Sequence, residues 1–238
     1  MDTKIGELSI FLPTYNEEGN IKEVIQNTVE AANLNAEKWE LIVVDDGSTD
    51  STNRIVSEIA NSSKNISIIR HEKNSGYGAS LKTGFYNSKY NWISFIDSDG
   101  QFNFKEISKF IEKQKESGAD MVIGFYNKRK VSFTKVITSK VWEALVYILF
   151  GLNVRDIDCG FKLISRKVIN GIAHLESERG AFISSELLIK AKKKGYKIAE
   201  IAVTHYPRTK GKGTGRKLNV IIESFIDLLK LWKKLRWE

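Results

Sequence analysis

W-I-S-F-I-D-S-D-G-Q, residues 92–101, is the stretch of sequence that decides the fold. An apolar run rich in aromatic and β-branched residues ends in two aspartates, which is typical of a buried strand with carboxylates at its end. Side chains at i and i+2 of an extended segment point the same way, so Asp97 and Asp99 can face one ligand together. Two anions held so close repel each other unless a cation lies between them. The stretch therefore predicts a site for a divalent metal ion.

The same pattern of a short apolar run followed by a polar loop recurs through the first half of the chain. Strands are predicted at 8–12, where Pro13 should close the strand, and at 41–44, 66–69 and 92–96. Helical spacing of apolar residues lies between them, so the chain should build βαβ units and a mostly parallel sheet flanked by helices. Loops after parallel strands gather at one edge of the sheet, and four polar loops should form one site there. These loops are residues 13–17, 45–50, 70–78 and 97–101.

The remaining elements are predicted from the same periodicities. The first helix should begin at residues 16–18, and the segment 126–135 should be a basic loop. Residues 218–237 fit a final amphipathic helix. Further helices are expected at 51–60, 79–88, 104–117, 138–152 and 185–194, and further strands at 121–124, 161–164 and 197–206.

The composition narrows the class of protein. The chain has 238 residues, of which 42% are apolar and 28% charged, which is typical of a globular domain. Its single cysteine, Cys159, excludes an intramolecular disulfide framework and a cysteine cluster for zinc. The formal charge of +8 favours anionic partners. No signal peptide and no run of about 20 apolar residues is recognised, so we expect a cytosolic protein.

Five motifs in order along the chain carry a family resemblance. The motifs are P-T-Y-N-E (13–17), V-V-D-D-G-S-T-D (43–50), N-S-G-Y-G-A-S-L-K-T-G (74–84), D-S-D-G-Q (97–101) and D-C-G-F-K-L (158–163). Over about residues 8–217 the chain resembles the family 2 glycosyltransferases, in the branch of dolichol-phosphate mannose synthases and polyprenyl-phosphate glucosyltransferases. The resemblance implies a GT-A fold, a nucleotide-sugar donor, a divalent metal ion and inversion of the anomeric centre. It divides the chain into a catalytic domain, 1–217, and an amphipathic basic helix, 218–238.

The resemblance also assigns roles to residues. Asp97, Asp99 and Gln101 take the metal-binding role, and their oxygen atoms suit Mg²⁺ or Mn²⁺. Asp99, Arg208 and Lys217 are the expected catalytic residues, because 208–217 matches a mobile basic segment that closes over the donor. The residues expected to bind the nucleotide sugar are Pro13, Tyr15, Glu17, Val44, Asp46, Asp97, Ser98, Asp99, Gln101, Arg208 and Lys217.

The acceptor side of the site is assigned from fewer matches. Lys135 and Ser139 match acceptor-phosphate positions, and Arg129 is expected to replace an arginine that the family carries elsewhere. Glu186 is a candidate base or sugar-orienting residue, or else a first-turn residue stabilised by the helix dipole. A phosphate acceptor is already ionised near neutral pH, so it needs positioning more than proton abstraction.

Three further features have a structural and a functional interpretation. The glycine-bearing loop 74–84 lacks a complete G-x-G-x-x-G, and we expect a tight turn there rather than a phosphate cradle. Asp50 or Ser51 should cap the helix that follows, while Asp46 reaches the ligand. The apolar stripe of 218–237 suits either a membrane interface or packing on the catalytic domain. His71, His174 and His205 are given no role.

The expected activity is transfer of a hexose from a nucleotide sugar to a polyprenyl (dolichyl) phosphate by an enzyme peripheral on the cytosolic face of a membrane. Mannose from GDP-mannose is the first choice of donor, and UDP-glucose is the close alternative. A membrane-spanning partner subunit is compatible with this function. The rival interpretations are a transferase acting on a soluble or polysaccharide acceptor, a non-catalytic sugar-nucleotide-binding subunit and a basic nucleic-acid-binding module; the clustered acidic loops argue against nucleic acid as a partner.

Overall fold

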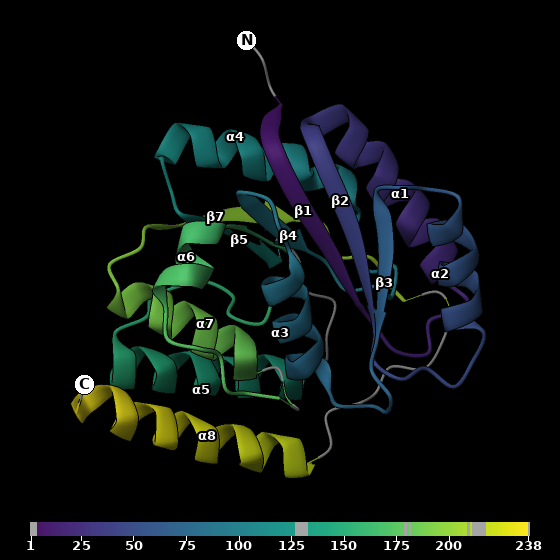
Figure 1. The fold of residues 1–238 in the computed structure, drawn as a ribbon. Helices are drawn as coiled ribbons and strands as arrows, with labels where there is room; N and C mark the ends of the chain where they lie inside the picture. The colour runs from purple at the N-terminus through teal and green to yellow at the C-terminus, as the bar shows by residue number, and fades with distance from the viewer. Residues whose placement is uncertain are drawn as a thin grey trace.

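A single seven-stranded sheet lies at the centre of the molecule (Figure 1). The computed structural model describes residues 4–126, 133–178, 180, 182–208, 210 and 218–237. The strand order is β3-β2-β1-β4-β6-β5-β7, and β6 is antiparallel to both of its neighbours. The other pairs are parallel, which confirms the mostly parallel α/β sheet. The strands are β1 (Ile5–Thr14), β2 (Ala36–Asp45), β3 (Ile66–Arg70), β4 (Trp92–Phe95), β5 (Met121–Tyr126), β6 (Lys162–Ser165) and β7 (Ile198–Val203).

Helices cover both faces of the sheet (Figure 1). One face carries α1 (Ile21–Asn35), α2 (Thr52–Asn61) and α4 (Ile107–Ser117), with the 3₁₀ turn η1 (Phe104–Glu106) ahead of α4. The other face carries α3 (Tyr77–Asn87), α6 (Arg166–Gly171) and α7 (Phe182–Lys193). Beyond α7 lie α5 (Phe133–Phe150) and α8 (Leu218–Trp237).

Alternation of side chains along the central strands builds two separate cores. In β1, Leu8, Ile10 and Leu12 enter the core under α1, whereas Phe11 enters the core under α3. The Phe11 ring stacks on Phe95 with centroids 5.1 Å apart. A Cβ atom on Gly84 would lie 2.2 Å from that ring, so α3 can pack this closely only because position 84 is glycine. This contact fixes the helix that follows the 74–78 loop.

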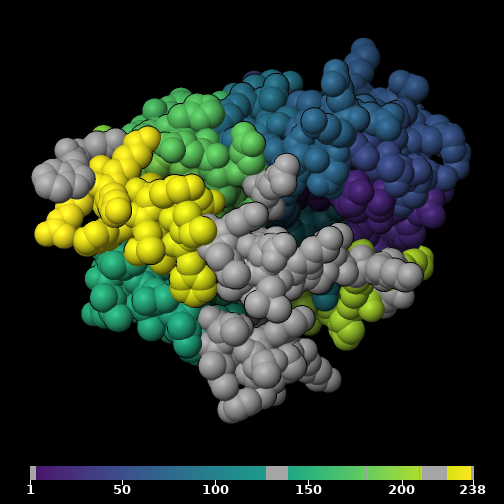
Figure 2. Space-filling view, turned by 90° about the horizontal axis from the view of Figure 1, so that it is seen from below, coloured from purple at the N-terminus to yellow at the C-terminus, as the bar shows by residue number. Residues whose placement is uncertain are grey.

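The apolar stripe of α8 is partly packed on α5 and partly exposed. The rings of Trp142 in α5 and Phe225 in α8 lie 5.2 Å apart, and Leu228 and Leu231 of α8 are buried. Figure 2 shows α8 lying between α5 and the α6–α7 region on one face of the molecule. Packing on the domain is therefore confirmed for this part of the stripe. Other apolar side chains of the same two helices stay exposed: Val141, Tyr147, Ile148, Ile226 and Leu229. In the described part of the chain, no helix is both long and apolar enough to span a bilayer.

Several predicted boundaries were wrong, and the reasons are local. Strand β1 continues through Pro13 to Thr14. Its pairing with β4 ends at Phe11, so the N–H that Pro13 lacks would have no partner in β4. Helix α1 begins at Ile21 instead of residues 16–18, since Asn16 has a left-handed backbone with φ of 54°. Helix α5 begins at Phe133, inside the predicted basic loop. Helix α7 begins at Phe182, three residues before the predicted start, and α6 was not predicted.

Candidate active site

The carboxylate of Asp97 lies just beyond the end of β4, between α3 and the loop that precedes β6. The Tyr77 hydroxyl donates a hydrogen bond of 2.8 Å to Asp97 Oδ1. On the other side the backbone of Gly160 lies so close that a Cβ atom there would be 2.4 Å from Asp97 Oδ2. Burial, followed by repulsion from Asp99, raises the pKa of Asp97 from 3.8 to about 7. A nearby positive charge would therefore stabilise the ionised carboxylate of Asp97.

Asp99 is joined to the segment after β7 by Arg208. The Arg208 guanidinium lies 3.5 Å from Asp99 Oδ2 and donates a hydrogen bond of 2.5 Å to Glu17 Oε1. Asn20 donates to the other oxygen of Glu17 at 2.7 Å. Burial raises the pKa of Glu17, while Asn20 and Arg208 oppose the rise. The structure therefore brings three predicted site residues, Glu17, Asp99 and Arg208, into one ionic cluster.

Gln101 connects the same two segments through its backbone and its side chain. Its backbone N–H donates to Asp99 Oδ1 at 3.0 Å, and its carbonyl accepts a bond of 2.9 Å from Tyr206 N–H. Its side-chain nitrogen donates to the Tyr206 carbonyl at 3.1 Å. The side-chain oxygen of Gln101 is consequently the atom suited to act as a metal ligand.

The predicted nucleotide-binding residues lie along the ends of β1 and β2. Pro13 is paired in register with Val44, and the Ser98 hydroxyl donates to the Pro13 carbonyl at 2.8 Å. Pro13, Val44 and Ser98 are buried, and their assignment to nucleotide binding stays a prediction. Tyr15 is half-buried at the edge, where its ring is accessible for stacking on a base.

Asp46 is held by three partners from the loop between β3 and α3. Its Oδ1 lies 2.7 Å from His71 Nδ1 and accepts a bond of 2.9 Å from Ser75 N–H, and its Oδ2 accepts one of 2.8 Å from Gly76 N–H. The amides of the 74–78 loop thus bind a carboxylate of the protein itself, as a structural turn would. His71, which was given no role from sequence, follows directly after β3, and this position at the sheet edge was the signal that it belongs to the site.

The loop between β2 and α2 contains the helix cap expected from its sequence. Asp50 Oδ1 accepts a bond of 2.9 Å from Thr52 N–H, and Ser51 forms no side-chain cap. Burial opposes ionisation of Asp50, but hydrogen bonds from the Thr52 side chain and from the backbone N–H groups of Thr52 and Glu18 outweigh it and lower the pKa of Asp50. Asp50 is therefore the capping residue, while Asp46 lies at the site.

Glu186 is buried inside α7, where three donors surround its carboxylate. The N–H groups of Glu176 and Ser177 each donate to it at 2.9 Å, and Lys190 Nζ donates at 2.6 Å. The segment held in this way accepts a bond of 2.8 Å from Ala79 N–H through the Glu178 carbonyl, at the start of α3. These bonds give Glu186 a positioning effect on the helix that carries Tyr77.

The acceptor-side assignments fall largely beyond what the structure describes. Arg129 lies outside the described residues, and so does the side chain of Lys135. Lys217, which is expected to be a catalytic and donor-binding residue, also lies outside them. Ser139 is buried on α5. These four assignments remain predictions.

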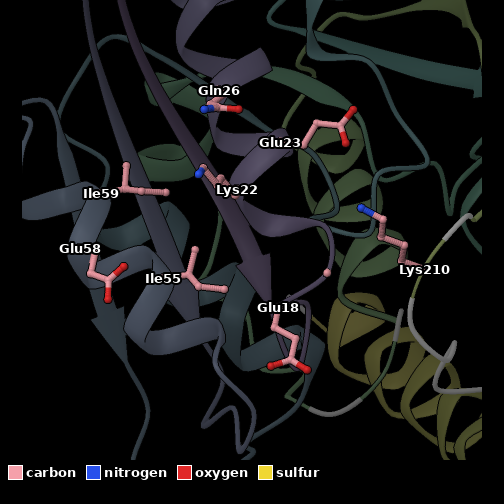
Figure 3. Close-up of a pocket in the computed structure, with 9 residues that line it drawn as sticks. Glu18, Lys22, Glu23, Gln26, Ile55, Glu58, Ile59 and Lys210 are labelled. Atoms are coloured by element: carbon pink, nitrogen blue, oxygen red, sulfur yellow. The ribbon is translucent and has the colours of Figure 1, made fainter.

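A separate open cavity of about 620 Å³ lies between α1 and α2 (Figure 3). Its wall includes Glu18, Glu23 and Glu58 together with Lys22 and Lys210. Neither Asp97 nor Asp99 lines it, so this cavity is adjacent to the ionic cluster of Arg208 without containing the predicted metal ligands.

A divalent metal ion fits the residues around Asp97 and Asp99. In the ranges that the structure describes, no three His, Cys, Asp or Glu side chains group closely enough to form a metal site by themselves. Mg²⁺ is usually bound by one or two carboxylates and completes its shell with substrate phosphates and water. Two neighbouring carboxylates, one with a raised pKa, match that type of site.

Several proteins of known name are similar in sequence to this chain over most of its length. A dolichyl-phosphate beta-glucosyltransferase of Trichomonas vaginalis is 27% identical over 242 residues, covering 94% of this chain and 72% of the relative. The dolichyl-phosphate beta-glucosyltransferase of Saccharomyces cerevisiae is 27% identical, covering 83% and 66%. The dodecaprenyl-phosphate galacturonate synthase of Rhizobium johnstonii is 27% identical, covering 98% and 68%.

Solved structures show the same fold. Glucosyl-3-phosphoglycerate synthase from Mycobacterium tuberculosis, in complex with Mn²⁺ and UDP-glucose, superposes with a TM-score of 0.68 at 22% identity, covering 94% of this chain and 77% of that one. This likeness confirms the GT-A fold. The family model described as Glycosyl transferase family 2 matches residues 9–172, well over half of the chain. The protein therefore belongs to glycosyl transferase family 2 and is a glycosyltransferase.

Proposed function

We propose that the protein transfers a hexose from a nucleotide sugar to a polyprenyl phosphate, with inversion at the anomeric carbon. The observation that carries the proposal is the pair Asp97 and Asp99 beside Arg208, because it places two carboxylates suited to a metal ion next to a cationic side chain. Relatives that are named for transfer to dolichyl or dodecaprenyl phosphate support the choice of acceptor.

UDP-glucose is the proposed donor. The first choice from sequence was GDP-mannose, and no relative reported above is named for mannose. Two of them are dolichyl-phosphate beta-glucosyltransferases, which favours the glucose alternative. GDP-mannose is accordingly the competitor that a donor experiment has to exclude.

In the proposed reaction, an oxygen of the acceptor phosphate attacks the anomeric carbon as the bond from that carbon to the nucleoside diphosphate breaks. Asp97 and Asp99 would hold the metal ion, with the Gln101 side-chain oxygen as a further ligand; the ion supplies Lewis-acid neutralisation of the diphosphate. Arg208 is placed beside Asp99 to add positive charge at the same point. The acceptor arrives ionised, so the chain's task is to position it and to neutralise charge.

The outer helices are the proposed membrane contact. Val141, Ile148, Ile226 and Leu229 are exposed on α5 and α8. Lys230, Lys233, Lys234 and Arg236 are exposed along α8. Exposed apolar side chains beside basic ones favour the surface of an anionic membrane, where a polyprenyl phosphate would be presented.

A donor and acceptor panel tests the proposal. With Mn²⁺, UDP-glucose should raise the melting temperature more than GDP-mannose does, because a ligand of the native state stabilises it by mass action. Radiolabelled glucose should then appear on a polyprenyl phosphate in vesicles containing anionic lipid. Stabilisation by GDP-mannose alone would overturn the donor assignment, and transfer only to a water-soluble acceptor would overturn the lipid acceptor.

A further inference from the structure

Lys162 is a fully buried lysine beneath the proposed metal site, and the mechanism above does not use it. Lys162 lies on β6 and is paired in register with Phe95 of β4. Phe95 is two residues before Asp97 in the sequence. Its ammonium is 5.6 Å from the centre of the Phe95 ring. Burial lowers the pKa of Lys162, against the opposing effect of nearby acidic groups that include Asp97. Burying an amino group costs free energy of folding, so we expect its contacts to serve a specific role.

The contacts of Lys162 are with the loop 157–160, which lies against Asp97. Its Nζ donates to the carbonyl of Ile157 at 3.3 Å and to the carbonyl of Cys159. The next residue, Gly160, is the one whose backbone lies against Asp97 Oδ2. Lys162 thus binds two backbone carbonyls just before the glycine that touches the carboxylate, and its own backbone follows that glycine in β6.

Asp97 is confined between this turn and Tyr77. The Tyr77 hydroxyl fixes Oδ1 from α3, and Gly160 leaves no room for Oδ2 to move toward the loop. A metal ligand whose orientation is set by neighbouring groups binds more tightly than one that must first be ordered.

We propose that Lys162 is a positioning residue for the metal site: by clamping the 157–160 loop, it keeps the Asp97 carboxylate in the orientation that binds the metal ion. This inference rests on the proposed function, because it takes Asp97 as a metal ligand. It assigns no contact between Lys162 and substrate. Each of two residues in D-C-G-F-K (158–162) then has a structural role. Gly160 leaves space for the Asp97 carboxylate, and Lys162 holds the backbone that carries Gly160.

The test is a titration of the protein with Mn²⁺, in which free Mn²⁺ is measured by its EPR signal, first without nucleotide and then with UDP against a UDP-only blank. Lys162→Met should weaken Mn²⁺ binding about ten-fold or more, the effect typical of losing a group that orients a metal ligand. Lys162→Gln, which can still donate to one carbonyl, should lie between Lys162→Met and the wild type. Tyr77→Phe should weaken binding as well, because it releases the other side of Asp97.

Ser94→Ala is the matched control. The Ser94 hydroxyl is also buried in this part of the sheet, and its 2.9 Å hydrogen bond is to the Lys162 carbonyl in β6 rather than to the 157–160 loop. It should lower the melting temperature while leaving the Mn²⁺ affinity within about two-fold of the wild type.

Three results would overturn the inference. The first is wild-type Mn²⁺ affinity in a folded Lys162→Met protein, and the second is an equal loss of affinity in Ser94→Ala. The third is failure of both Lys162 variants to fold, judged by circular dichroism, which would make the residue a requirement of the fold. No Mn²⁺ binding by the wild-type protein, even with UDP, would instead refute the proposed metal site itself, on which the inference depends.

Discussion

Two strands of this sheet end in acidic pairs, and the surroundings of the two pairs are opposite. At the end of β2, Asp45 is fully buried and accepts bonds from Ser48 N–H at 2.9 Å and from the Asn53 side chain at 3.1 Å. Asp46 beside it has three close partners from the loop between β3 and α3. The protein itself therefore supplies the donors that these two carboxylates need.

At the end of β4 the protein supplies fewer donors. Asp97 accepts from the Tyr77 hydroxyl, and Asp99 accepts from Gln101 N–H and has Arg208 at 3.5 Å. The pKa of Asp97 rises to about 7 as a result of burial and of repulsion from Asp99. An acid at a strand end is structural where donors of the protein satisfy it, as for Asp45, and is a candidate metal ligand where they do not, as for Asp97 and Asp99.

Substitution of Asp99 should give the largest effect in this comparison. Asp99→Asn removes a charge that the metal ion and Arg208 share, and we expect transfer to fall by at least about 10³-fold, or about 4 kcal/mol of transition-state stabilisation. The melting temperature without metal should change little, because Asp99 has few protein donors. Initial rates with UDP-glucose and a polyprenyl phosphate measure the first quantity, and a thermal melt measures the second.

Asp45→Asn is the matched change at the other strand end. It places an amide against the donors that now bind a carboxylate and should cost roughly 1–3 kcal/mol of stability, while transfer continues at temperatures where the protein is folded. If Asp45→Asn abolished transfer in the folded protein and Asp99→Asn did not, the two pairs would have been assigned the wrong way round.

The raised pKa of Asp97 predicts a smaller effect that depends on pH. The folded protein holds this proton up to about pH 7, whereas the ordinary pKa of the carboxyl is 3.8, so the folded state binds more protons in between. Stability without metal should therefore fall as pH rises through this window. Asp97→Asn removes the titration, and its melting temperature should exceed that of the wild type by a few degrees at pH 8, since 1 kcal/mol corresponds to roughly 2–4 °C at this size.

At about pH 4 the two proteins should melt together, because wild-type Asp97 is then protonated. Mn²⁺ with UDP should reverse the order at pH 8 by stabilising only the protein that keeps the carboxylate. A difference in melting temperature that stays constant from pH 4 to 8 would contradict the assignment of this pKa to Asp97.

The sequence predicted those parts of the site that depend on local pattern. Alternation of apolar runs and polar loops places Asp46, Asp97 and Asp99 at one edge of the sheet, and in the strand order β2 and β4 flank β1 on either side. The cap at Asp50 follows from residues adjacent in sequence. Such features need only the periodicity of strands and the chemistry of helix ends.

The contacts that hold the acids could not be predicted, because they join residues far apart in the chain. Tyr77 meets Asp97, and Gly160 meets the same carboxylate, only because of the packing of α3 and the antiparallel register of β6. In α8, periodicity alone did not separate buried Leu228 from exposed Leu229, since apolar residues occupy more than one face of the helix. Tertiary packing decides both cases.

The smallest predicted effect concerns the imidazole that supports Asp46. A carboxylate carries no hydrogen, so His71 Nδ1 is the donor at 2.7 Å, while Nε2 lies 2.9 Å from the Thr83 hydroxyl. His71→Gln can reach only one of these partners and should cost about 1 kcal/mol of stability, measured by denaturant unfolding. The stabilisation of this variant by UDP-glucose should be slightly weaker, because Asp46 would be held less firmly. Thr83→Val leaves the bond to Asp46 in place and should cost less than His71→Gln; the opposite order would mean that the imidazole serves α3 rather than the acid at the end of β2.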